Sequence, residues 1–355
     1  IVRERGIANE FPDTIVAEAN ALTSMRAITR EDEETRRDFR GALTVTIDPE
    51  DAKDFDDAIS LKTLKNGNLE IGIHIADVSH YCRPKSELDR EAANRATSVY
   101  LVDRTIPMLP EALSNDLCSL NPMEDKRAVS GVFEVDNNAV VQERWFGKTI
   151  IRSEARLTYA QAQTYIDDST AKAKKSNNSP ALAPALKTLH DIARLLKSRR
   201  HEAGAIEFEE NEVRFILDEA GRPTSVYAKD RQDAHKLVEE FMLLANREVA
   251  EFIERIEKNA RRQMPFVYRI HDAPNREKIE ELAVFLRALG HDLAVTEDGV
   301  SSQDLNALFK RIEGEAAEGL IKTAAIRAMA KAVYSTANIG HFGLAFGYYT
   351  HFTSP

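Results

Sequence analysis

The chain reads Thr46-Ile-Asp-Pro-Glu-Asp-Ala-Lys-Asp-Phe-Asp-Asp57 at the end of the apolar run Leu43-Thr-Val-Thr-Ile47. The apolar run has the composition of a buried β-strand, and a second apolar run begins at Ala58-Ile-Ser-Leu61. Four acids within ten residues therefore stand between two predicted core segments, Asp48, Asp54, Asp56 and Asp57, in addition to Glu50 and Asp51. The acids follow directly on a predicted core strand, so several negative charges are expected to lie close together.

These clustered carboxylates predict a cation site. Carboxylates close to one another repel, so a cation should neutralise them. Ligands that are all oxygens suit Mg²⁺ or Mn²⁺ rather than zinc. Divalent metals held by aspartates are typical of sites that cut or make phosphodiester bonds. The alternative is a solvated turn or a helix cap, since aspartates favour both, and the cluster alone does not decide between them. An EF-hand is excluded, because its alternating acids, loop glycine and distal glutamate are absent.

The composition is that of an ordinary globular protein, with 43% hydrophobic and 30% charged residues among 355. No apolar run approaches the length that spans a bilayer, so we expect no membrane partner. The two cysteines, Cys82 and Cys118, are expected to be reduced, as in a cytoplasmic protein. A net charge of −10 argues against nucleic-acid binding if taken alone, but an acidic exterior can coexist with a basic channel. Candidate phosphate contacts, each of which is otherwise a plain surface cation, are Arg152, Arg156, Lys229, Arg231 and Lys236.

The pattern along the chain mixes strands and helices without regular alternation, which predicts the α+β class. Residues 1–40 are interpreted as a connecting segment, with a solvated helix over the mixed-charge run Arg30–Arg37. Turn residues predict three hairpins, whose strands are 58–64 with 69–78, 130–135 with 139–144, and 212–217 with 224–229. Apolar residues at helical spacing predict helices over 185–202, 234–258, 275–289, 302–312 and 315–334, and the polar stretch 167–180 is expected to be a loop.

The spacing of the four aspartates resembles the RNB catalytic signature of the ribonuclease II and ribonuclease R family. Further segments resemble that family in the same order, and they are Gly72–Val78, Thr97–Leu101, Ile106–Glu111, Leu113–Pro122, Ala155–Tyr159, His341–Ala345 and His351–Pro355. The resemblance runs from about Gly41 to the last residue. It leans towards ribonuclease R, particularly at Gly204–Phe208 and His351–Pro355.

The resemblance implies an RNB fold for residues 41–355, in which mixed sheets and packed helices form an RNA channel. In that family, cold-shock domains normally precede this domain and an S1 domain follows it. The segment that matches His351–Pro355 is followed in the family by a run whose arginine reaches the scissile phosphate. The chain is therefore expected to be an excerpt of a longer protein, with a catalytic domain that is incomplete at its C-terminal end.

The activity that the resemblance implies is processive, Mg²⁺-dependent 3′→5′ hydrolysis of single-stranded RNA to nucleoside 5′-monophosphates by a cytoplasmic monomer. Mn²⁺ is an alternative metal. The resemblance assigns Asp48, Asp54 and Asp57 to metal binding, and it assigns Asp56 to the acid most closely tied to catalysis, within the same metal-binding set.

The resemblance also implies roles in RNA binding. Tyr100 and Phe208 match positions that clamp bases near the 3′ end, and Glu239 matches an acid that contacts the terminal nucleotides, with Glu240 as the alternative. His74 and His341 are expected to be structural. Tyr159 either lines the RNA path or packs inside the protein.

Two other functions compete with this one. A catalytically inactive RNB-type protein would only bind RNA, but such relatives typically lose members of the acidic set, and all four acids are present here. A hydrolase of another class with an aspartate-bound metal is the second alternative, and the ordered string of RNB-like segments counts against it.

Overall fold

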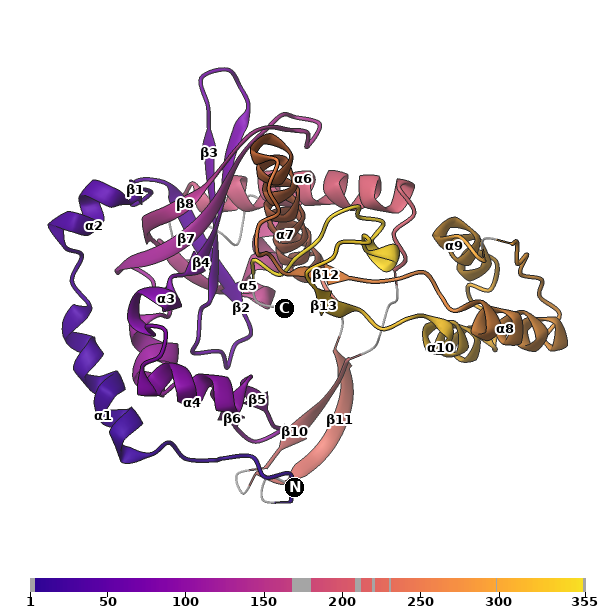
Figure 1. Ribbon diagram of the computed structural model, residues 1–355, viewed down its shortest axis with the longest axis horizontal. Coiled ribbons are helices and arrows are strands. Elements are labelled where there is room, and N and C mark those ends of the chain that lie inside the picture. Colours follow the sequence, from indigo (N-terminus) through magenta and orange to yellow (C-terminus); the bar gives the residue numbers. More distant parts are fainter. Residues whose placement is uncertain are drawn as a thin grey trace. The chain divides into compact units, whose positions relative to one another are not determined.

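The computed structural model of the chain divides into two compact units (Figure 1). Unit 1 comprises Ile1–Ala193 and Asn211–Glu239, and unit 2 comprises Arg194–Glu210 and Glu240–Pro355. Two of the three unit boundaries fall within the long helices α6 (Leu182–Glu202) and α7 (Asp233–Ala260). The structure describes residues 4–167, 180–207, 212–218, 221–229, 231–297 and 299–353.

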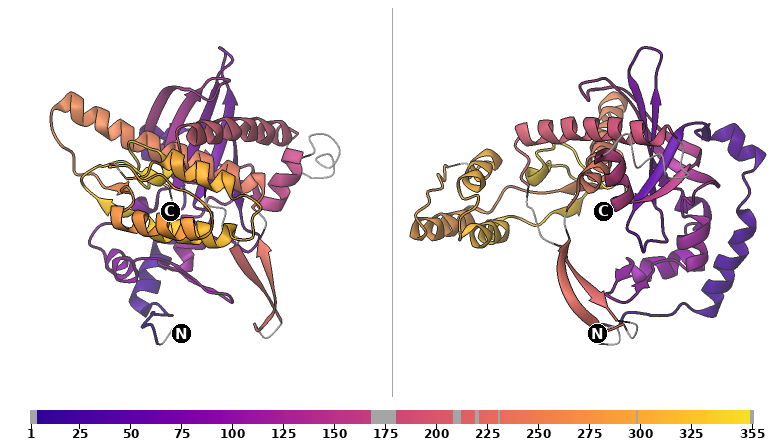
Figure 2. Two further views of the ribbon diagram at one scale, coloured as in Figure 1. Left: turned by 90° about the vertical axis from the view of Figure 1, so that its right-hand side faces the viewer. Right: turned by 180° about the vertical axis from the view of Figure 1, so that it is seen from behind.

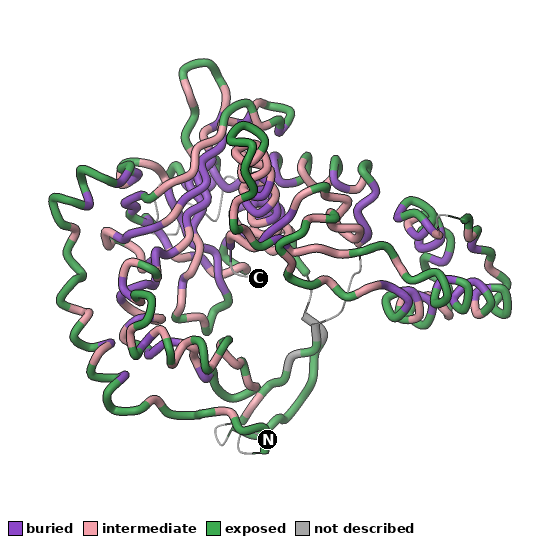
Figure 3. Tube along the Cα trace, viewed as in Figure 1, coloured by how far each residue is buried: buried purple, intermediate pink, exposed green. Residues whose placement is uncertain are grey.

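A mixed seven-stranded sheet with the order β1-β8-β7-β4-β3-β2-β9 forms the centre of unit 1 (Figure 1). Its strands are β1 (Arg37–Asp38), β2 (Leu43–Asp48), β3 (Asp57–Thr63), β4 (Leu69–Ala76), β7 (Asp125–Val135), β8 (Val141–Arg152) and β9 (Ala155–Thr158). The β1–β8 and β2–β9 pairs are parallel, and the other neighbours are antiparallel. Buried residues concentrate along these strands (Figure 3).

The predicted hairpins β3–β4 and β7–β8 are confirmed. The first turns through Gly67, whose φ of 87° lies in the left-handed region that glycine adopts most readily. The strands β7 and β8 are longer than predicted, because the ladder continues as far as the pair Asp125–Arg152. The third predicted hairpin is also confirmed, as β10 (Glu212–Leu217) and β11 (Pro223–Lys229).

The strands β2 and β3 separate at one end of the sheet. They pair at Leu43–Leu61, Thr44–Ser60 and Val45–Ile59. Beyond these pairs, β2 continues beside β9 as far as the pair Asp48–Thr158, whereas β3 continues beside β4 back to the pair Asp57–Ile75. The two strands therefore form a fork, and residues 49–56 connect its prongs.

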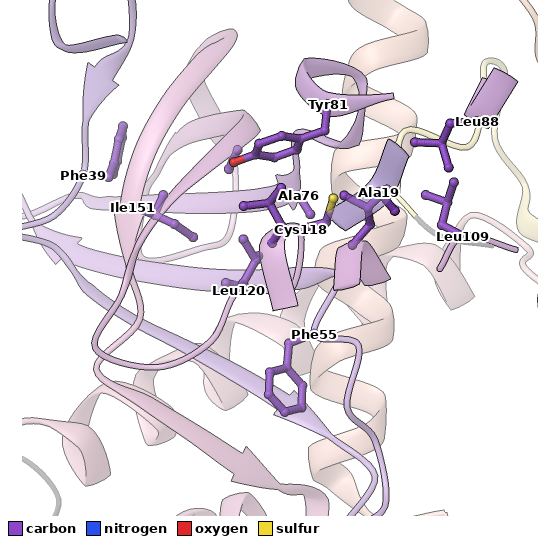
Figure 4. Packing of buried hydrophobic residues seen from close by; sticks show 14 of the residues in the cluster. Ala19, Phe39, Phe55, Ala76, Tyr81, Leu88, Leu109, Cys118, Leu120 and Ile151 are labelled. Atoms are coloured by element: carbon purple, nitrogen blue, oxygen red, sulfur yellow. The ribbon is translucent and has the colours of Figure 1, made fainter. Parts of the chain in front are cut away.

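Short helices and a hydrophobic core support this sheet. The smaller elements of unit 1 are α1 (Asp13–Leu22), η1 (Thr23–Met25), α2 (Arg30–Thr35), α3 (Val78–Tyr81), α4 (Glu87–Arg95), β5 (Val99–Tyr100), β6 (Thr105–Ile106), the π-helical turn η2 (Ala112–Leu117) and α5 (Tyr159–Asp167). One buried cluster joins Ala19 of α1 to Ala76 at the end of β4 and to Phe55, Cys118 and Leu120 (Figure 4). Both cysteines are free, as expected. The loop between the prongs of the fork is thus tied to the core through Phe55.

The charged N-terminal segment is packed more tightly than its sequence predicts. A helix is present at Arg30–Thr35, but the expectation that it is solvated is wrong for Asp32, which is buried. Asp32 accepts hydrogen bonds from Arg36 and from Arg127, each at 3.0 Å. Burial alone would raise the pKa of Asp32, but the hydrogen bonds from Arg127 and Thr29 outweigh burial and hold this pKa well below its usual range. Arg127 is distant in sequence, so the local charge pattern could not reveal it. The division of the chain at residue 40 stays a prediction.

A buried line of polar side chains crosses four neighbouring strands. His74 on β4 bonds through Nδ1 to Ser130 Oγ on β7 at 2.6 Å and through Nε2 to Ser60 Oγ on β3 at 2.9 Å. Ser130 Oγ in turn lies 2.6 Å from Thr149 Oγ1 on β8. Burial lowers the pKa of His74 to about 3, so the ring is neutral at physiological pH. These bonds give His74 a structural role, as the sequence led us to expect.

Gly72→Ala is expected to destabilise the protein by about 2–4 kcal/mol, through overpacking and the loss of a buried hydrogen bond. A Cβ atom at Gly72 would lie 2.4 Å from Ser60 Oγ and 2.5 Å from His74 Nε2. Urea unfolding followed by the fluorescence of Trp145, the single tryptophan, measures this loss. Gly41→Ala is the matched control, because a Cβ atom there meets nothing within 4 Å. Equal stabilities of the two variants would contradict this account of the buried line.

Unit 2 combines a small sheet with a helical core. The strand β12 (Tyr268–Ile270) pairs antiparallel with β13 (Val333–Ser335). The helices α8 (Arg276–Ala288), α9 (Ser302–Arg311) and α10 (Glu318–Ala328) share one hydrophobic cluster, and α8 lies beside α10 (Figures 1 and 2). A 3₁₀ turn, η4 (Phe342–Leu344), follows.

The predicted helix over 315–334 is wrong at its C-terminal end. It stops at Ala328, because Met329 is extended and Val333–Ser335 pairs with a strand that lies more than sixty residues earlier in the chain. The other predicted helices are confirmed to within a few residues at each end. The α+β class is therefore confirmed. No helix in the described parts of the chain has the length and apolarity to cross a membrane.

Candidate functional site

The fork brings the four predicted aspartates together. Asp48 ends β2 and Asp57 begins β3, while Asp54 and Asp56 lie on the connection between them. We call residues 48–57 the acidic loop. Asp48 is only 8% exposed, and the other three side chains are half-buried. The predicted cluster is therefore a spatial cluster as well as a sequence cluster.

The backbone of the acidic loop is held from the side of the core. The Phe55 N–H donates to Ser119 Oγ at 2.9 Å, and the Phe55 carbonyl accepts from the Leu120 N–H at 2.8 Å. The Asp56 carbonyl accepts from the Ala76 N–H at 2.9 Å. These hydrogen bonds hold the backbone of Phe55 and Asp56, and none of them uses the Asp56 carboxylate.

Arg156 holds the opposite end of the acidic loop. It lies on β9 beside Thr46, and its Nη2 donates to the carbonyls of Pro49 at 2.6 Å and Glu50 at 2.8 Å. Its guanidinium lies 5.2 Å from the centroid of the Phe55 ring. We listed Arg156 among the candidate phosphate contacts, but the structure commits it to the loop backbone instead.

The carboxylates of the loop are electrostatically coupled. Burial raises the pKa of Asp48 to about 6; the Thr46 hydroxyl and the charge of Arg156 oppose this rise, and the charges of Asp56 and Asp54 add to it. Burial and the charge of Asp54 raise the pKa of Asp56 to about 6. Burial, Asp48 and Asp56 raise the pKa of Asp57 to about 7. Negative charge at this site is therefore costly unless a cation compensates it.

The donor set fits a hard divalent cation. Asp48 Oδ2 and Thr46 Oγ1 are buried, and neither makes a hydrogen bond of good geometry within the described residues, although the Thr46 hydroxyl is close enough to lower the pKa of Asp48 somewhat. A buried carboxylate oxygen without a partner is costly, and coordination to a cation would satisfy it. No three His, Cys, Asp or Glu side chains converge into a ready-made metal cage in the parts of the chain that the structure describes. The chemistry of the site thus fits Mg²⁺ or Mn²⁺, and coordination would need the carboxylates to adjust.

Two tyrosines lie beside these acids. The Tyr100 hydroxyl donates to Asp54 at 3.4 Å, whereas the residue as a whole is 69% exposed. Desolvation of the hydroxyl, followed by the charges of Asp54 and Asp56, raises the pKa of Tyr100. Tyr159 begins α5 and stacks on His235, with 3.9 Å between the ring centroids. Burial, followed by the charges of Asp57 and Asp48, raises the pKa of Tyr159 to about 12. Tyr159 is thus packed inside the protein, which is one of the two interpretations that the sequence left open, and its place along an RNA path stays a prediction.

The other residues predicted to contact RNA are Phe208 and Glu239, with Glu240 as the alternative. Phe208 lies outside the described residues. Glu239 lies on α7 and pairs with Arg231. The alternative, Glu240, is only 4% exposed and pairs with Arg200, so it is a buried structural acid of unit 2.

The other candidate phosphate contacts are paired with acids where they are described. Arg152 pairs with Asp125 at 2.6 Å and Lys236 with Asp233 at 3.4 Å, in addition to the pair of Arg231 with Glu239. The side chain of Lys229 lies outside the described residues. His341 accepts from the Leu344 N–H at 3.2 Å, which agrees with the structural role expected for it.

Sequence reasoning missed Ser119 and the true role of Arg156. Both lie inside segments that we quoted for their family resemblance, Leu113–Pro122 and Ala155–Tyr159. The resemblance marked these segments as important, but only the structure shows that their hydrogen bonds hold the acidic loop.

Comparison with known proteins adds independent information. The RNB domain family matches residues 36–355. Ribonuclease R 1 of Lactococcus lactis subsp. lactis is 38% identical over 355 residues, which cover 100% of this chain and 42% of that protein. DIS3-like exonuclease 2 of Schizosaccharomyces pombe is 41% identical over 345 residues, which cover 92% of this chain and 36% of that protein. The chain thus spans less than half the length of these curated relatives.

Solved structures show the same fold. The structure of Mycoplasma genitalium RNase R in complex with ribose methylated single-stranded RNA has a TM-score of 0.89 at 28% identity, covering 100% of this chain and 53% of that one. Yeast Ssd1, described as a pseudonuclease, has a TM-score of 0.70 at 22% identity, covering 92% of this chain and 39% of that one, which shows the fold alone. The RNB fold and the resemblance to ribonuclease R are therefore confirmed. With four coupled aspartates at the fork of its sheet and a family match from residue 36 to its last residue, this chain belongs to the RNB domain family.

Proposed function

We propose that this chain provides the catalytic domain of a processive 3′→5′ exoribonuclease that hydrolyses single-stranded RNA to nucleoside 5′-monophosphates. The observation that carries the proposal is the acidic loop, in which four coupled carboxylates are gathered on a backbone that other residues hold. Relatives named ribonuclease R support RNA as the substrate, as does the relative described in complex with single-stranded RNA.

The proposed chemistry needs a nucleophilic water, a stabilised leaving oxygen and a neutralised phosphoryl group. A divalent cation held by Asp48, Asp54, Asp56 and Asp57 would supply charge neutralisation and a more acidic water. The protein itself supplies the position of these carboxylates, because Ser119 and Arg156 fix the loop that carries them. Asp56 is the residue that we assign most directly to catalysis.

Tyr100 is suited to hold the RNA beside these acids. Tyr100 is largely exposed, and its hydroxyl contacts Asp54. A base stacked on the Tyr100 ring would therefore lie close to the acidic loop. Stacking on an aromatic ring contributes about 1–3 kcal/mol per base and does not depend on sequence. Phe208 and Glu239 remain proposed RNA contacts on the strength of the family resemblance.

A protein of this fold that only binds RNA is the competing function. The fold is shared with yeast Ssd1, which is described as a pseudonuclease, so the fold does not decide between the two functions. The complete set of four aspartates and their coupling favour the enzyme.

Incubation of the protein with single-stranded RNA labelled at its 5′ end is expected to release nucleoside 5′-monophosphates in the presence of Mg²⁺ or Mn²⁺. Exhaustive chelation should abolish this release, and Zn²⁺ should restore it poorly, because the proposed ligands are oxygens without His or Cys. Chromatography of the products and a sequencing gel of the shortened RNA measure both expectations. RNA that is bound but stays intact in Mg²⁺ would favour the inactive RNA-binding protein, and full activity after chelation would contradict the metal site.

A further inference from the structure

The small sheet of unit 2 carries a cation directly beside an exposed aromatic ring. Arg269 on β12 and Tyr334 on β13 are direct cross-strand partners. The Arg269 guanidinium carbon lies 4.7 Å from the centroid of the Tyr334 ring, and Tyr334 is 55% exposed. A guanidinium and an aromatic ring that share one sheet position form a surface with both a positive charge and a flat apolar face.

The Tyr334 ring is fixed from the side of the protein. Its hydroxyl lies 2.7 Å from His351 Nδ1, and the two rings meet edge to face with 5.6 Å between their centroids. His351 packs in turn against the buried Tyr349, with 5.5 Å between centroids. A tyrosine whose hydroxyl and ring edge are both held loses little conformational freedom when a ligand stacks on it.

The charge of Arg269 is not neutralised by an acid. Its backbone N–H donates to the Tyr349 carbonyl at 2.9 Å, but its side chain forms no hydrogen bond or ion pair with any residue that the structure describes. Other arginines of unit 2 do pair with glutamates, as Arg276 does with Glu280 at 2.9 Å. The guanidinium of Arg269 is therefore available to an anion.

The neighbouring histidines add no further positive charge to this surface. Burial lowers the pKa of His351, and the positive charge of Arg269 lowers it further. His341 behaves likewise, with burial and the neighbouring His271 lowering its pKa to about 4 and Arg269 adding to the effect. Both rings are therefore neutral at physiological pH, and Arg269 is the cation of this surface.

We propose that Arg269, Tyr334 and His351 of unit 2 form a further RNA-binding site that takes one nucleotide of a single strand. A base stacks on the Tyr334 ring, the Arg269 guanidinium pairs with an adjacent phosphate, and His351 positions the tyrosine. Aromatic rings joined to cations are the usual means of holding single strands without sequence preference. This inference rests on the proposed function for its choice of RNA over a protein partner.

The first test measures binding of a fluorescent single-stranded oligonucleotide to the Asp56→Asn protein, so that the RNA stays intact. Tyr334→Ala should weaken binding roughly tenfold, since one stacked base contributes about 1–3 kcal/mol. Arg269→Met should weaken it by a similar factor and reduce the slope of log affinity against log salt by about 0.7, the value for one phosphate contact on a single strand. Tyr334→Phe, which keeps the ring, should bind within about threefold of the parent.

Arg276→Met is the matched control, because this arginine lies in the same unit but is paired with Glu280. It should change neither the affinity nor the salt dependence. If Tyr334→Ala and Arg269→Met also leave both unchanged, the proposal is overturned, and the Arg269–Tyr334 pair serves only the stability of the small sheet.

A second measurement avoids variants that fail to fold. RNA that contains 5-iodouridine is cross-linked by light to the unsubstituted protein, and the attached peptides are identified by mass spectrometry. A cross-link at Tyr334 or His351 supports the site, and cross-links that consistently fall elsewhere overturn it. Failure of the proposed function is seen separately, because RNA that stays intact in Mg²⁺ refutes hydrolysis whatever the cross-links show.

Discussion

Asp56→Asn is expected to reduce RNA hydrolysis by roughly a thousandfold while RNA binding persists, the scale seen when one transition-state contact is removed. Asparagine keeps the shape of the side chain but removes a negative charge from the centre of the acidic loop. The backbone should not move, because Phe55 and Asp56 are held through their main-chain atoms. Single-turnover hydrolysis and equilibrium binding of the same oligonucleotide measure the two effects separately.

Asp51→Asn is the matched control for this experiment. Asp51 lies on the same loop and is exposed, and it stands outside the four coupled carboxylates. Its substitution removes the same charge from the same segment and should leave turnover within about twofold, because an exposed charge is screened by solvent. Substantial hydrolysis by Asp56→Asn, or an equal loss in both variants, would contradict the assignment of Asp56.

Arg156→Ala is expected to lower turnover by roughly a hundredfold, because small displacements of catalytic groups cost about that much. The substitution removes the hydrogen bonds to the carbonyls of Pro49 and Glu50 and the contact with Phe55. The acidic loop would lose its side-chain support from β9, although the β2–β9 ladder would remain, and the carboxylates would shift relative to one another. The loss should appear in kcat, with KM within a few fold, because Arg156 does not hold the RNA in this account.

Two variants separate positioning from general damage. Arg156→Lys retains a donor that can reach a carbonyl and should recover part of the turnover. Arg152→Ala removes a partly exposed arginine from β8, the strand before β9 in the chain, where it pairs with Asp125, and should leave kcat unchanged. If Arg156→Ala raised KM and left kcat intact, Arg156 would be a phosphate contact after all.

Much of the fold follows from local patterns. The hairpin β3–β4 is encoded by an Asn-Gly turn between alternating runs, and the helix α8 by apolar spacing that ends before Gly290. Local patterns fail where a distant partner decides the outcome. Val333–Ser335 becomes a strand because β12 is available, and Asp32 on the helix α2 is buried because Arg127 reaches it from β7.

The candidate site shows the same division. The four aspartates can be recognised in the sequence because they fall within ten residues and because their spacing resembles a family signature. Ser119 and Arg156 were not recognisable as supports, since each is separated from the loop by more than sixty residues and acts by donating to main-chain atoms or accepting from them. Hydrogen bonds to the backbone do not depend on which side chains the loop carries, so the loop sequence does not reveal them. The candidate catalytic aspartates can therefore be predicted from the sequence, while the residues that hold their loop in place are identified only by the structure.

The way the acidic loop is held has a consequence for how such a protein evolves. Phe55 and Ser119 anchor the loop on one side and Arg156 anchors it on the other, and none of these bonds uses a carboxylate of the cluster. Selection can therefore discard the acids one at a time without dismantling the architecture that displays them. A lineage that loses hydrolysis would keep an intact loop architecture, which could then serve RNA binding alone.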